Sequence, residues 1–177
     1  WFSVLDLKDA FWTCPLAVES RDMFASEWED PVTGRKQQFH WTALPQGFTE
    51  SPSLFGQVLE QILEEIIFPP GIKLLQYVDD LLISGKKEME VRSATIKLLI
   101  FLGEKGLRVS KTKLQFIEKE VKYLGHLISK GKRRINPERI SGIVAVTLPK
   151  SKKEIRKFLG LLGYCRLWIE SFSQCVK

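Results

Sequence analysis

The sequence predicts an α+β fold, which mixes antiparallel strands with helices along one chain. Short apolar segments rich in aromatic and β-branched residues alternate with turn signals, as is typical of strands. Apolar residues recur at helical spacing within residues 54–67, which indicates a helix. Residues 74–84 form an apolar segment interrupted by two carboxylates, which predicts two strands joined by a tight turn.

The first part of the chain predicts strands. Residues 1–7 (WFSVLDL) combine aromatic and β-branched residues, as strands do. Residues 24–30 (FASEWED) and 37–44 (QQFHWTAL) predict two more strands, with PVTGRK between them as the turn of a hairpin near Gly34. The next segment, PQGFTESP, is expected to be a loop.

Two helices are expected to flank the interrupted segment 74–84. The first carries apolar residues at helical spacing up to Ile67, and the segment PPG at residues 69–71 ends it. The second runs from about Glu88 to Lys105 and ends at Gly106.

The C-terminal part predicts strands followed by helices. Strands are expected at residues 114–117 and 123–129, and the pattern becomes helical from Asn136. Ser151 and Glu154 form an S-x-x-E capping box, which opens a helix that is expected to run to about Trp168.

The charge of the chain is unevenly distributed. Lysine and arginine outnumber aspartate and glutamate, the net charge is +6 and the isoelectric point is about 9.2. The basic residues crowd between Lys105 and Lys157, which suggests a polyanionic partner such as nucleic acid. A solvated, lysine-rich surface explains the charge equally well, and composition leaves both interpretations open.

Cysteine content and hydropathy indicate the class of protein. The three cysteines, Cys14, Cys165 and Cys175, have no metal-ligand spacing, and their odd number fits no disulfide framework. They are expected to be reduced thiols of an intracellular protein. No apolar segment is long enough to span a membrane and no signal peptide is recognisable. Because the chain begins within a hydrophobic strand, we expect it to be part of a longer protein.

Two adjacent carboxylates, Asp79 and Asp80, interrupt the most apolar segment of the chain. A structural explanation is a turn pair at a hairpin tip, because aspartate tolerates turn conformations. A third carboxylate, Asp6, also lies at the end of an apolar strand, and it would converge on the tip if the strands were neighbours. Clustered carboxylates repel one another unless cations lie between them, and hard oxygen ligands suit Mg²⁺. Two such ions can promote an in-line phosphoryl displacement.

Five segments in order resemble the motifs of retroviral reverse transcriptases, in particular those of gammaretroviruses and endogenous retroviruses. They are D-x-x-x-x-F at residues 6–11, LPQGFTESPSLF at 44–55, YVDD at 77–80, VKYLGHLIS at 121–129 and LPKSKKEIRKFLGLLGYCRLWIESF at 148–172. The resemblance covers essentially the whole chain. It implies an RNA-directed DNA polymerase that adds deoxynucleotides to a primer 3′-OH, built as a right-hand palm, an antiparallel sheet backed by helices, with partial fingers and a helical thumb.

The resemblance also implies roles for individual residues. The catalytic, metal-binding residues would be Asp6, Asp79 and Asp80. The nucleotide would be bound by Asp9, Ala10, Phe11 and Gln46. Primer and template would be bound by Tyr77, Val78, Tyr123, Leu124, Gly125, His126, Lys157, Gly160 and Gly163.

Several of these residues also have a plain structural explanation. Phe11 could be a core aromatic, Gln46 an ordinary loop residue and His126 a surface residue of a strand. Gly160 and Gly163 weaken a helix by roughly 1 kcal/mol each relative to alanine, a cost that either a close approach to nucleic acid or close helix packing would explain.

The implied domains, cofactors and partners follow from the same resemblance. The palm would comprise residues 1–12 and 44–127, the partial fingers 13–43 and the thumb 128–177. The cofactors would be two Mg²⁺ ions, or Mn²⁺, and the partners a primed RNA or DNA template and deoxynucleoside triphosphates. The rest of a pol polyprotein would supply upstream fingers and an RNase H domain, in an intracellular or virion-associated protein without a membrane partner. The alternative is a truncated, inactive nucleic-acid-binding remnant of an endogenous retroviral polymerase.

Overall fold

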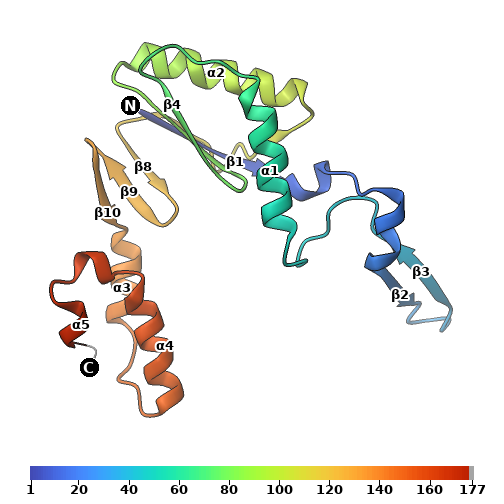
Figure 1. Ribbon diagram of the computed structural model, residues 1–177. Helices are drawn as coiled ribbons and strands as arrows, with labels where there is room; N and C mark the ends of the chain where they lie inside the picture. Colours follow the sequence, from blue (N-terminus) through green and yellow to red (C-terminus); the bar gives the residue numbers. More distant parts are fainter. Residues whose placement is uncertain (176–177) are drawn as a thin grey trace. The chain divides into compact units, whose positions relative to one another are not determined.

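The computed structural model describes residues 1–175 and contains two compact units, Trp1–Lys119 and Glu120–Lys177 (Figure 1). Each unit combines antiparallel strands with helices, so the expected α+β layout is confirmed. The division into palm, fingers and thumb remains a prediction, because the two units are defined by their compactness and not by function.

A five-stranded antiparallel sheet organises the first unit. Its order is β4 (Lys73–Tyr77), β5 (Asp80–Ser84), β1 (Phe2–Lys8) and β6 (Arg108–Val109), and β7 (Gln115–Glu118) also pairs with β1. The predicted strand–turn–strand unit is therefore present as β4 and β5. The central strand β1 is largely buried on both faces, in keeping with its apolar sequence.

Helices α1 (Ser51–Glu64) and α2 (Glu88–Glu104) build the core with this sheet (Figure 1). On α1 the buried residues Phe55, Leu59 and Leu63 are four residues apart, so they form one stripe. They join Leu5, Leu81 and other sheet residues in one hydrophobic cluster. The helix ends at Glu64, slightly before the expected Ile67, because its last turn tightens: the N–H groups of Glu65 and Ile66 donate to the carbonyls of Ile62 and Leu63.

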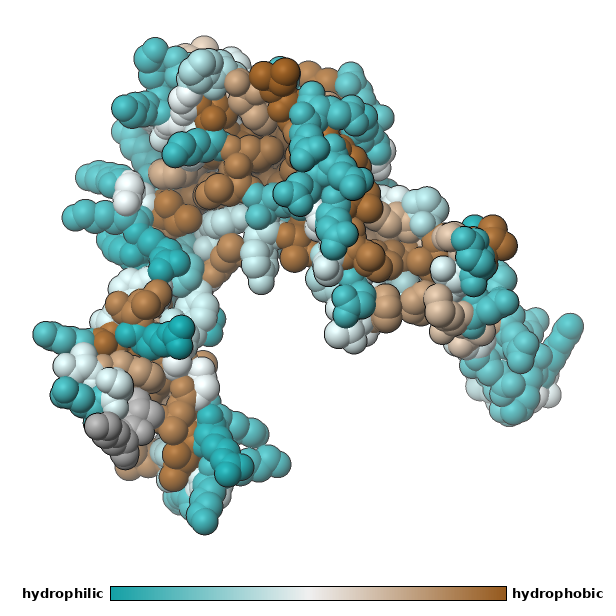
Figure 2. Space-filling view, viewed as in Figure 1, coloured by the Kyte–Doolittle hydropathy of each residue, from teal (hydrophilic) through white to brown (hydrophobic). Residues whose placement is uncertain are grey.

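A hairpin follows the first strand. Two 3₁₀ helices, η1 (Ala10–Thr13) and η2 (Val18–Phe24), which the sequence pattern did not indicate, lead to β2 (Ala25–Glu29) and β3 (Lys36–His40). Asp30 organises the turn, because its carboxylate accepts hydrogen bonds from the backbone N–H groups of Val32 (2.8 Å) and Thr33 (2.9 Å). Both strands are exposed, and hydrophilic side chains cover the tip of this hairpin (Figure 2).

The second unit begins with a three-stranded meander of β8 (Glu120–Tyr123), β9 (His126–Ser129) and β10 (Lys132–Ile135). The expectation of one strand over residues 123–129 is wrong. Leu124 and Gly125 both have positive φ, 49° and 76°, and form the two-residue turn between β8 and β9. Lys130 and Gly131, with φ of 49° and 71°, make the second turn in the same way, and β10 was not foreseen.

Helices complete the second unit. Asn136 caps α3 (Pro137–Val144) by accepting a hydrogen bond from the Glu138 N–H at 3.1 Å. Ser151 caps α4 (Lys152–Gly163) through the Glu154 N–H at 3.3 Å, as the capping box predicted. The expected extension of this helix to Trp168 is wrong. After Tyr164 the chain turns through Cys165 into η3 (Arg166–Trp168), and then into α5 (Phe172–Cys175).

Two simpler expectations can be compared with the described residues. Cys14 and Cys165 are free thiols, and the side chain of Cys175 lies outside the described part. Within residues 1–175, no helix has both the length and the apolar character needed to cross a membrane.

Candidate active site

The turn between β4 and β5 consists of Val78 and Asp79. Val78 has a φ of 54°, a left-handed conformation that is costly for a β-branched residue. Positive φ at the first central position and not at the second is the pattern of a type II′ turn, which favours glycine there. The strain, on the order of 1–3 kcal/mol, persists only when the surroundings hold the turn in place.

Asp6 lies opposite Asp80 in the sheet. The antiparallel register pairs Tyr77 with Asp80 across β4 and β5, and Asp80 with Asp6 across β5 and β1. Two backbone hydrogen bonds lie beside these paired residues. The Leu7 N–H donates to the Asp79 carbonyl (3.0 Å), and the Ser110 N–H donates to the Asp6 carbonyl (2.8 Å). The sheet therefore brings together three carboxylates that are up to 74 positions apart in the chain.

The proximity of these carboxylates changes their electrostatics. Partial burial raises the pKa of Asp80 above its usual value, and the negative charges of Asp79 and Asp6 raise it further. One cation offsets this repulsion. The Nζ atom of Lys113 lies 3.0 Å from Asp6 Oδ2, and this hydrogen bond raises the pKa of the lysine. The sequence pattern did not indicate Lys113, because it lies 107 residues from its partner.

A cavity of about 330 Å³ opens beside Asp6 and Asp79. It gathers six residues that the sequence had assigned to metal or nucleotide, together with Lys113 and Ser110; the six are Asp6, Asp9, Ala10, Phe11, Gln46 and Asp79. Asp80 does not line it. The lining of this cavity therefore combines carboxylates with an aromatic ring and an amide.

Phe11 lies both in the core and at the cavity, the two alternatives that the sequence left open. Its ring packs edge-to-face against Phe55 of α1, with centroids 5.7 Å apart, so part of it belongs to the core. The residue also lines the cavity and is only half-buried. Just before it, Asp9 has a φ of 55°, and this left-handed residue turns the chain from β1 into η1.

The donor set of this cavity fits a hard divalent cation. Among residues 1–175, no group of three acidic, histidine or cysteine side chains is arranged as a complete metal site. Three aspartates, Asp6, Asp9 and Asp79, nevertheless line one cavity, and Mg²⁺ is commonly held by one or two carboxylates together with substrate phosphates. The mutual repulsion that raises the pKa of Asp80 is also what a cation would relieve.

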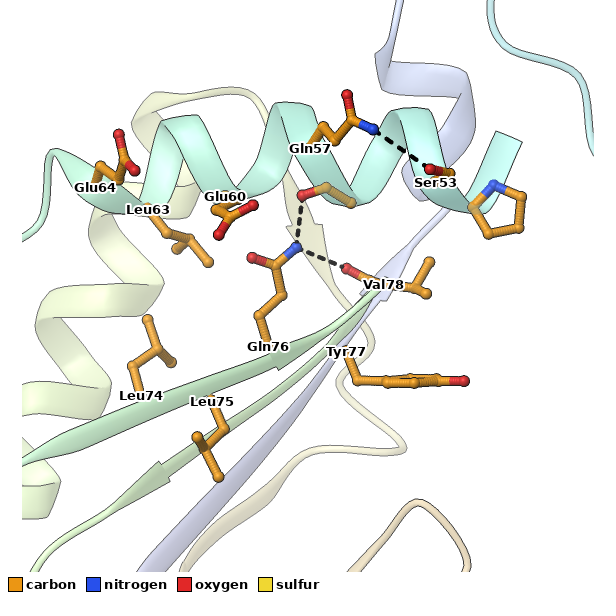
Figure 3. A pocket seen from close by; sticks show the side chains of 12 residues that line it. Ser53, Gln57, Glu60, Leu63, Glu64, Leu74, Leu75, Gln76, Tyr77 and Val78 are labelled. Carbon is orange, nitrogen blue, oxygen red and sulfur yellow. Dashed lines mark hydrogen bonds between the residues drawn. The ribbon is translucent and has the colours of Figure 1, made fainter. Parts of the chain in front are cut away.

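Tyr77 and Val78 line a second, more open groove of about 610 Å³ between β4 and α1 (Figure 3). Tyr77 is 59% exposed and its ring points away from α1 in this view. Gln76 spans the groove, and its Nε2 atom donates to the carbonyls of Gly56 (2.9 Å) and Val78 (3.4 Å). Neither bond could be foreseen from the sequence.

In the second unit, a hydrogen bond from Tyr164 stabilises the turn formed by Leu124 and Gly125. The Tyr164 hydroxyl donates to the Leu124 carbonyl at 2.8 Å and lies 2.7 Å from His126 Nε2. Which of the two groups donates in this second contact depends on the tautomer of His126. A Cβ on Gly125 would approach the same hydroxyl to 3.0 Å, so both space and φ favour glycine.

His126 is part of an aromatic and cationic cluster. Its ring stacks on Tyr164 (centroids 5.0 Å apart) and lies near Trp168 (5.2 Å). The guanidinium of Arg133 lies over Trp168, and that of Arg139 lies 3.6 Å from the Tyr164 ring centre. Burial and these two positive charges lower the pKa of His126. Nothing in the sequence indicated Tyr164 as the central residue of this cluster.

The remaining predicted residues lie on α4. Lys157 is exposed and lines a groove of about 200 Å³ with Phe158 and Leu161. A Cβ on Gly160 or Gly163 would meet no atom within 4 Å, so packing within the described residues does not explain either glycine. Apart from Asp80, which lines neither the cavity nor the groove, the predicted residues are thus distributed over one cavity and one groove of the first unit and over two regions of the second.

Comparison with known proteins identifies the family. The family model for reverse transcriptase (RNA-dependent DNA polymerase) matches residues 1–128. The chain is 49% identical over 175 residues to the Gag-Pol polyprotein of avian reticuloendotheliosis virus, covering 98% of this chain and 15% of that protein. It is 46% identical to the Gag-Pol polyprotein of baboon endogenous virus (strain M7), covering 98% and 10%. The chain therefore belongs to the reverse transcriptase family and is similar to a small part of these polyproteins.

Solved structures extend the likeness to the fold. A foamy viral protease-reverse transcriptase in complex with double-stranded DNA matches with a TM-score of 0.84 and 34% identity, covering 98% of this chain and 29% of that one. The same kind of enzyme in complex with an RNA/DNA hybrid matches with a TM-score of 0.79 and 34% identity, covering 93% and 21%. The α+β fold is accordingly that of a reverse transcriptase palm.

Proposed function

We propose that this chain forms the catalytic core of an RNA-directed DNA polymerase, which adds deoxynucleotides to a primer 3′-OH on an RNA or DNA template. The observation that supports this most is the cavity in which Asp6 and Asp79 meet Phe11 and Gln46. Carboxylates, a ring and an amide in one cavity suit the metal ions, sugar and base of a nucleotide. Membership in the reverse transcriptase family supports the same assignment.

We assign the metal sites to Asp6 and Asp79, with weaker ligation by Asp80, which lies outside the cavity lining. Two Mg²⁺ ions, or Mn²⁺, would lower the pKa of the primer hydroxyl and stabilise the leaving oxygen of the pyrophosphate. The protein holds these carboxylates in place through the sheet, because Asp6 and Asp80 are paired and the Asp79 carbonyl is bonded to the Leu7 N–H.

The nucleotide would lie against the other lining residues of the cavity. The backbone at Asp9 and Ala10, where the chain turns sharply into η1, would meet the triphosphate. Phe11, steadied from behind by Phe55, would lie beneath the sugar and exclude a 2′-hydroxyl by its bulk. Gln46, exposed at the cavity, would contact the incoming nucleotide.

Template and primer would be held by residues of both units, which are exposed or half-buried except for Tyr123, whose side chain is buried. Tyr77 and Val78 follow directly along β4 toward Asp79, which suits contact with the primer terminus. Tyr123, Leu124, Gly125 and His126 would hold the primer near its 3′ end, and Lys157, Gly160 and Gly163 would face the duplex. His126 would act indirectly, because its ring is engaged by Tyr164.

The wider setting is proposed from the relatives. The chain would be the palm (residues 1–12 and 44–127) with partial fingers (13–43) and thumb (128–177) of a pol polyprotein, in which other segments supply upstream fingers and RNase H. Such a protein would be intracellular or associated with a virion.

The test is Mg²⁺-dependent primer extension on an RNA template, with template–primer affinity measured in parallel. Asp79→Asn should abolish extension and leave the affinity nearly unchanged, because it removes a metal ligand and not a phosphate contact. Asp22→Asn, at an exposed residue near His40, is the matched control and should extend normally. Extension by the Asp79 variant at the normal rate would refute the metal assignment. Binding without any extension by the unaltered protein would instead indicate the inactive, nucleic-acid-binding remnant.

A further inference from the structure

We propose that Gln76 is a positioning residue, whose side-chain amide ties the Val78–Asp79 turn to helix α1 and thereby holds Asp79 in the cavity. The inference rests on the proposed polymerase function only in that Asp79 is the residue positioned. The physical claim concerns the turn itself and can be tested without catalysis.

Gln76 is a polar residue on the helix-facing side of its strand. Successive side chains of a strand alternate between faces, and Leu74, on the same side, packs against the core of the first unit. Figure 3 shows Leu74 and Gln76 directed toward α1, whereas Leu75 and Tyr77 point the other way. An amide in this half-buried place loses contact with water, so it needs hydrogen-bond partners from the protein.

Those partners lie on two different elements. Gln76 Nε2 donates to the carbonyl of Gly56 in α1 at 2.9 Å and to the carbonyl of Val78 in the turn at 3.4 Å. A primary amide has two N–H groups, so one side chain can serve both acceptors. The helix end of this link is rigid, because the neighbouring Phe55 and Leu59 are fully buried in the core.

The turn needs such a link because its backbone is strained. Val78 has a φ of 54°, which a β-branched residue adopts only where its surroundings oppose relaxation. The next carbonyl, that of Asp79, accepts the N–H of Leu7 in β1 at 3.0 Å. The turn is thus held on one side by α1 through Gln76 and on the other by β1 through Leu7.

The hydrogen bond between Leu7 and Asp79 provides a direct reporter. Gln76→Met keeps the length of the side chain and removes both N–H donors. The amide hydrogen of Leu7 should then exchange with solvent faster by about 2- to 12-fold, the change that corresponds to the loss of one neutral hydrogen bond. Gln76→Glu, which presents oxygens to both carbonyls, should raise the rate further.

The groove supplies a matched control. Gln57 lines the same groove, and its amide lies 3.4 Å from the hydroxyl of Ser53, away from the turn (Figure 3). Gln57→Met should therefore leave the exchange of Leu7 unchanged. An equal effect of both substitutions would mean that the groove as a whole, and not Gln76, supports the turn.

Glycine at position 78 separates positioning from general stability. Glycine adopts positive φ without strain, so in a Val78→Gly background Gln76→Met should change Leu7 exchange by less than about twofold. The proposal is overturned if Gln76→Met leaves Leu7 exchange unchanged, or if the increase is equally large in both backgrounds. It is also overturned if Leu7 exchanges faster while primer extension stays normal. Absence of extension in the unaltered protein would count against the polymerase function alone, because the exchange result does not depend on it.

Discussion

The ammonium group of Lys113 lies 3.0 Å from the carboxylate of Asp6, although 107 residues separate them in the sequence. This lysine lies beside the cluster of carboxylates formed by Asp6, Asp79 and Asp80. Its positive charge opposes the repulsion that, together with burial, raises the pKa of Asp80. A metal ion that binds the same carboxylates must compete with its positive charge.

Lys113→Ala should therefore strengthen metal binding. Without the ammonium group, the three carboxylates repel one another more strongly in the metal-free protein. They also attract a divalent cation more strongly, so the Mn²⁺ affinity should rise several-fold. Titration of Mn²⁺ followed by paramagnetic broadening of cavity signals measures this directly. Lys111→Ala, at an exposed lysine two positions earlier, is the control and should change little. Weaker Mn²⁺ binding in the Lys113 variant would show that the lysine supports the site.

The hairpin of β4 and β5 could be predicted because the sequence carries the relevant physics locally, whereas its proximity to Asp6 could be predicted only on the condition that the strands were neighbours. Apolar segments flank the paired carboxylates, and a strand must turn where charge cannot be buried. The register that pairs Asp6 with Asp80 then follows once β1 and β5 are neighbours. The family resemblance supplied four more residues of the cavity, Asp9, Ala10, Phe11 and Gln46, and no local pattern distinguishes Gln46 from a loop residue.

Other features depend on contacts between distant segments and could not be predicted. Lys113 meets Asp6, and Tyr164 meets Leu124, across long stretches of chain that leave no local signal. The turn at Leu124 was not foreseen for a different reason. Its apolar neighbours suit one continuous strand, and Gly125 was the single sign of the positive φ that divides it.

Phe11→Val in an active chain should relax the selection against ribonucleotides. Replacing the ring by the smaller valine side chain opens space beneath the sugar, so ribonucleotide incorporation should rise about tenfold or more. Deoxynucleotide incorporation should change by a much smaller factor. Incorporation of both substrates and thermal stability are measured together. If the contact with Phe55 is the whole role of Phe11, the variant should lose about 1–3 kcal/mol of stability with unchanged sugar selection. Phe24→Val, which disrupts the separate edge-to-face pair with Phe48, controls for the removal of an aromatic ring.

The basic face of α4 and the segment before it should contribute to duplex binding. Neutralising Lys150, Lys152, Lys153 and Lys157, all exposed, should weaken binding to all sequences alike. It should also lower the salt dependence by about one unit of slope for each phosphate that the variant no longer neutralises. Affinity is measured over a range of salt concentrations. The control neutralises four lysines of the first unit, Lys36, Lys73, Lys86 and Lys119. An unchanged salt slope would mean that these four lysines form a solvated surface that does not contact the duplex.

The stability of the second unit should depend on His126. Burial and the charges of Arg133 and Arg139 lower the pKa of this histidine in the folded state, whereas in the unfolded chain it should be near 6.5. Below that pH the unfolded chain binds the proton more readily, so stability should fall as the pH drops through about 6.5 toward the lowered pKa. Thermal unfolding of the unaltered protein and of His126→Gln from pH 8 to 5 measures this. The advantage of the unaltered protein should shrink with acidity, and parallel curves would contradict the prediction.

Strand β4, which leads into the Val78–Asp79 turn, is also the last strand of its sheet. Among the described strands it pairs with β5 alone, and Leu75 and Tyr77 on it are 53% and 59% exposed. An apolar strand at a sheet margin is a template for a second copy of itself, and Lys73 is its one charged residue. Concentrated solutions of the isolated chain should therefore self-associate through β4. Leu75→Lys should suppress this self-association, which light scattering at increasing protein concentration measures. Equal scattering by the variant and the unaltered protein would exclude association through β4. The strand that leads to the proposed active site is thus also a strand through which the molecule is open to aggregation.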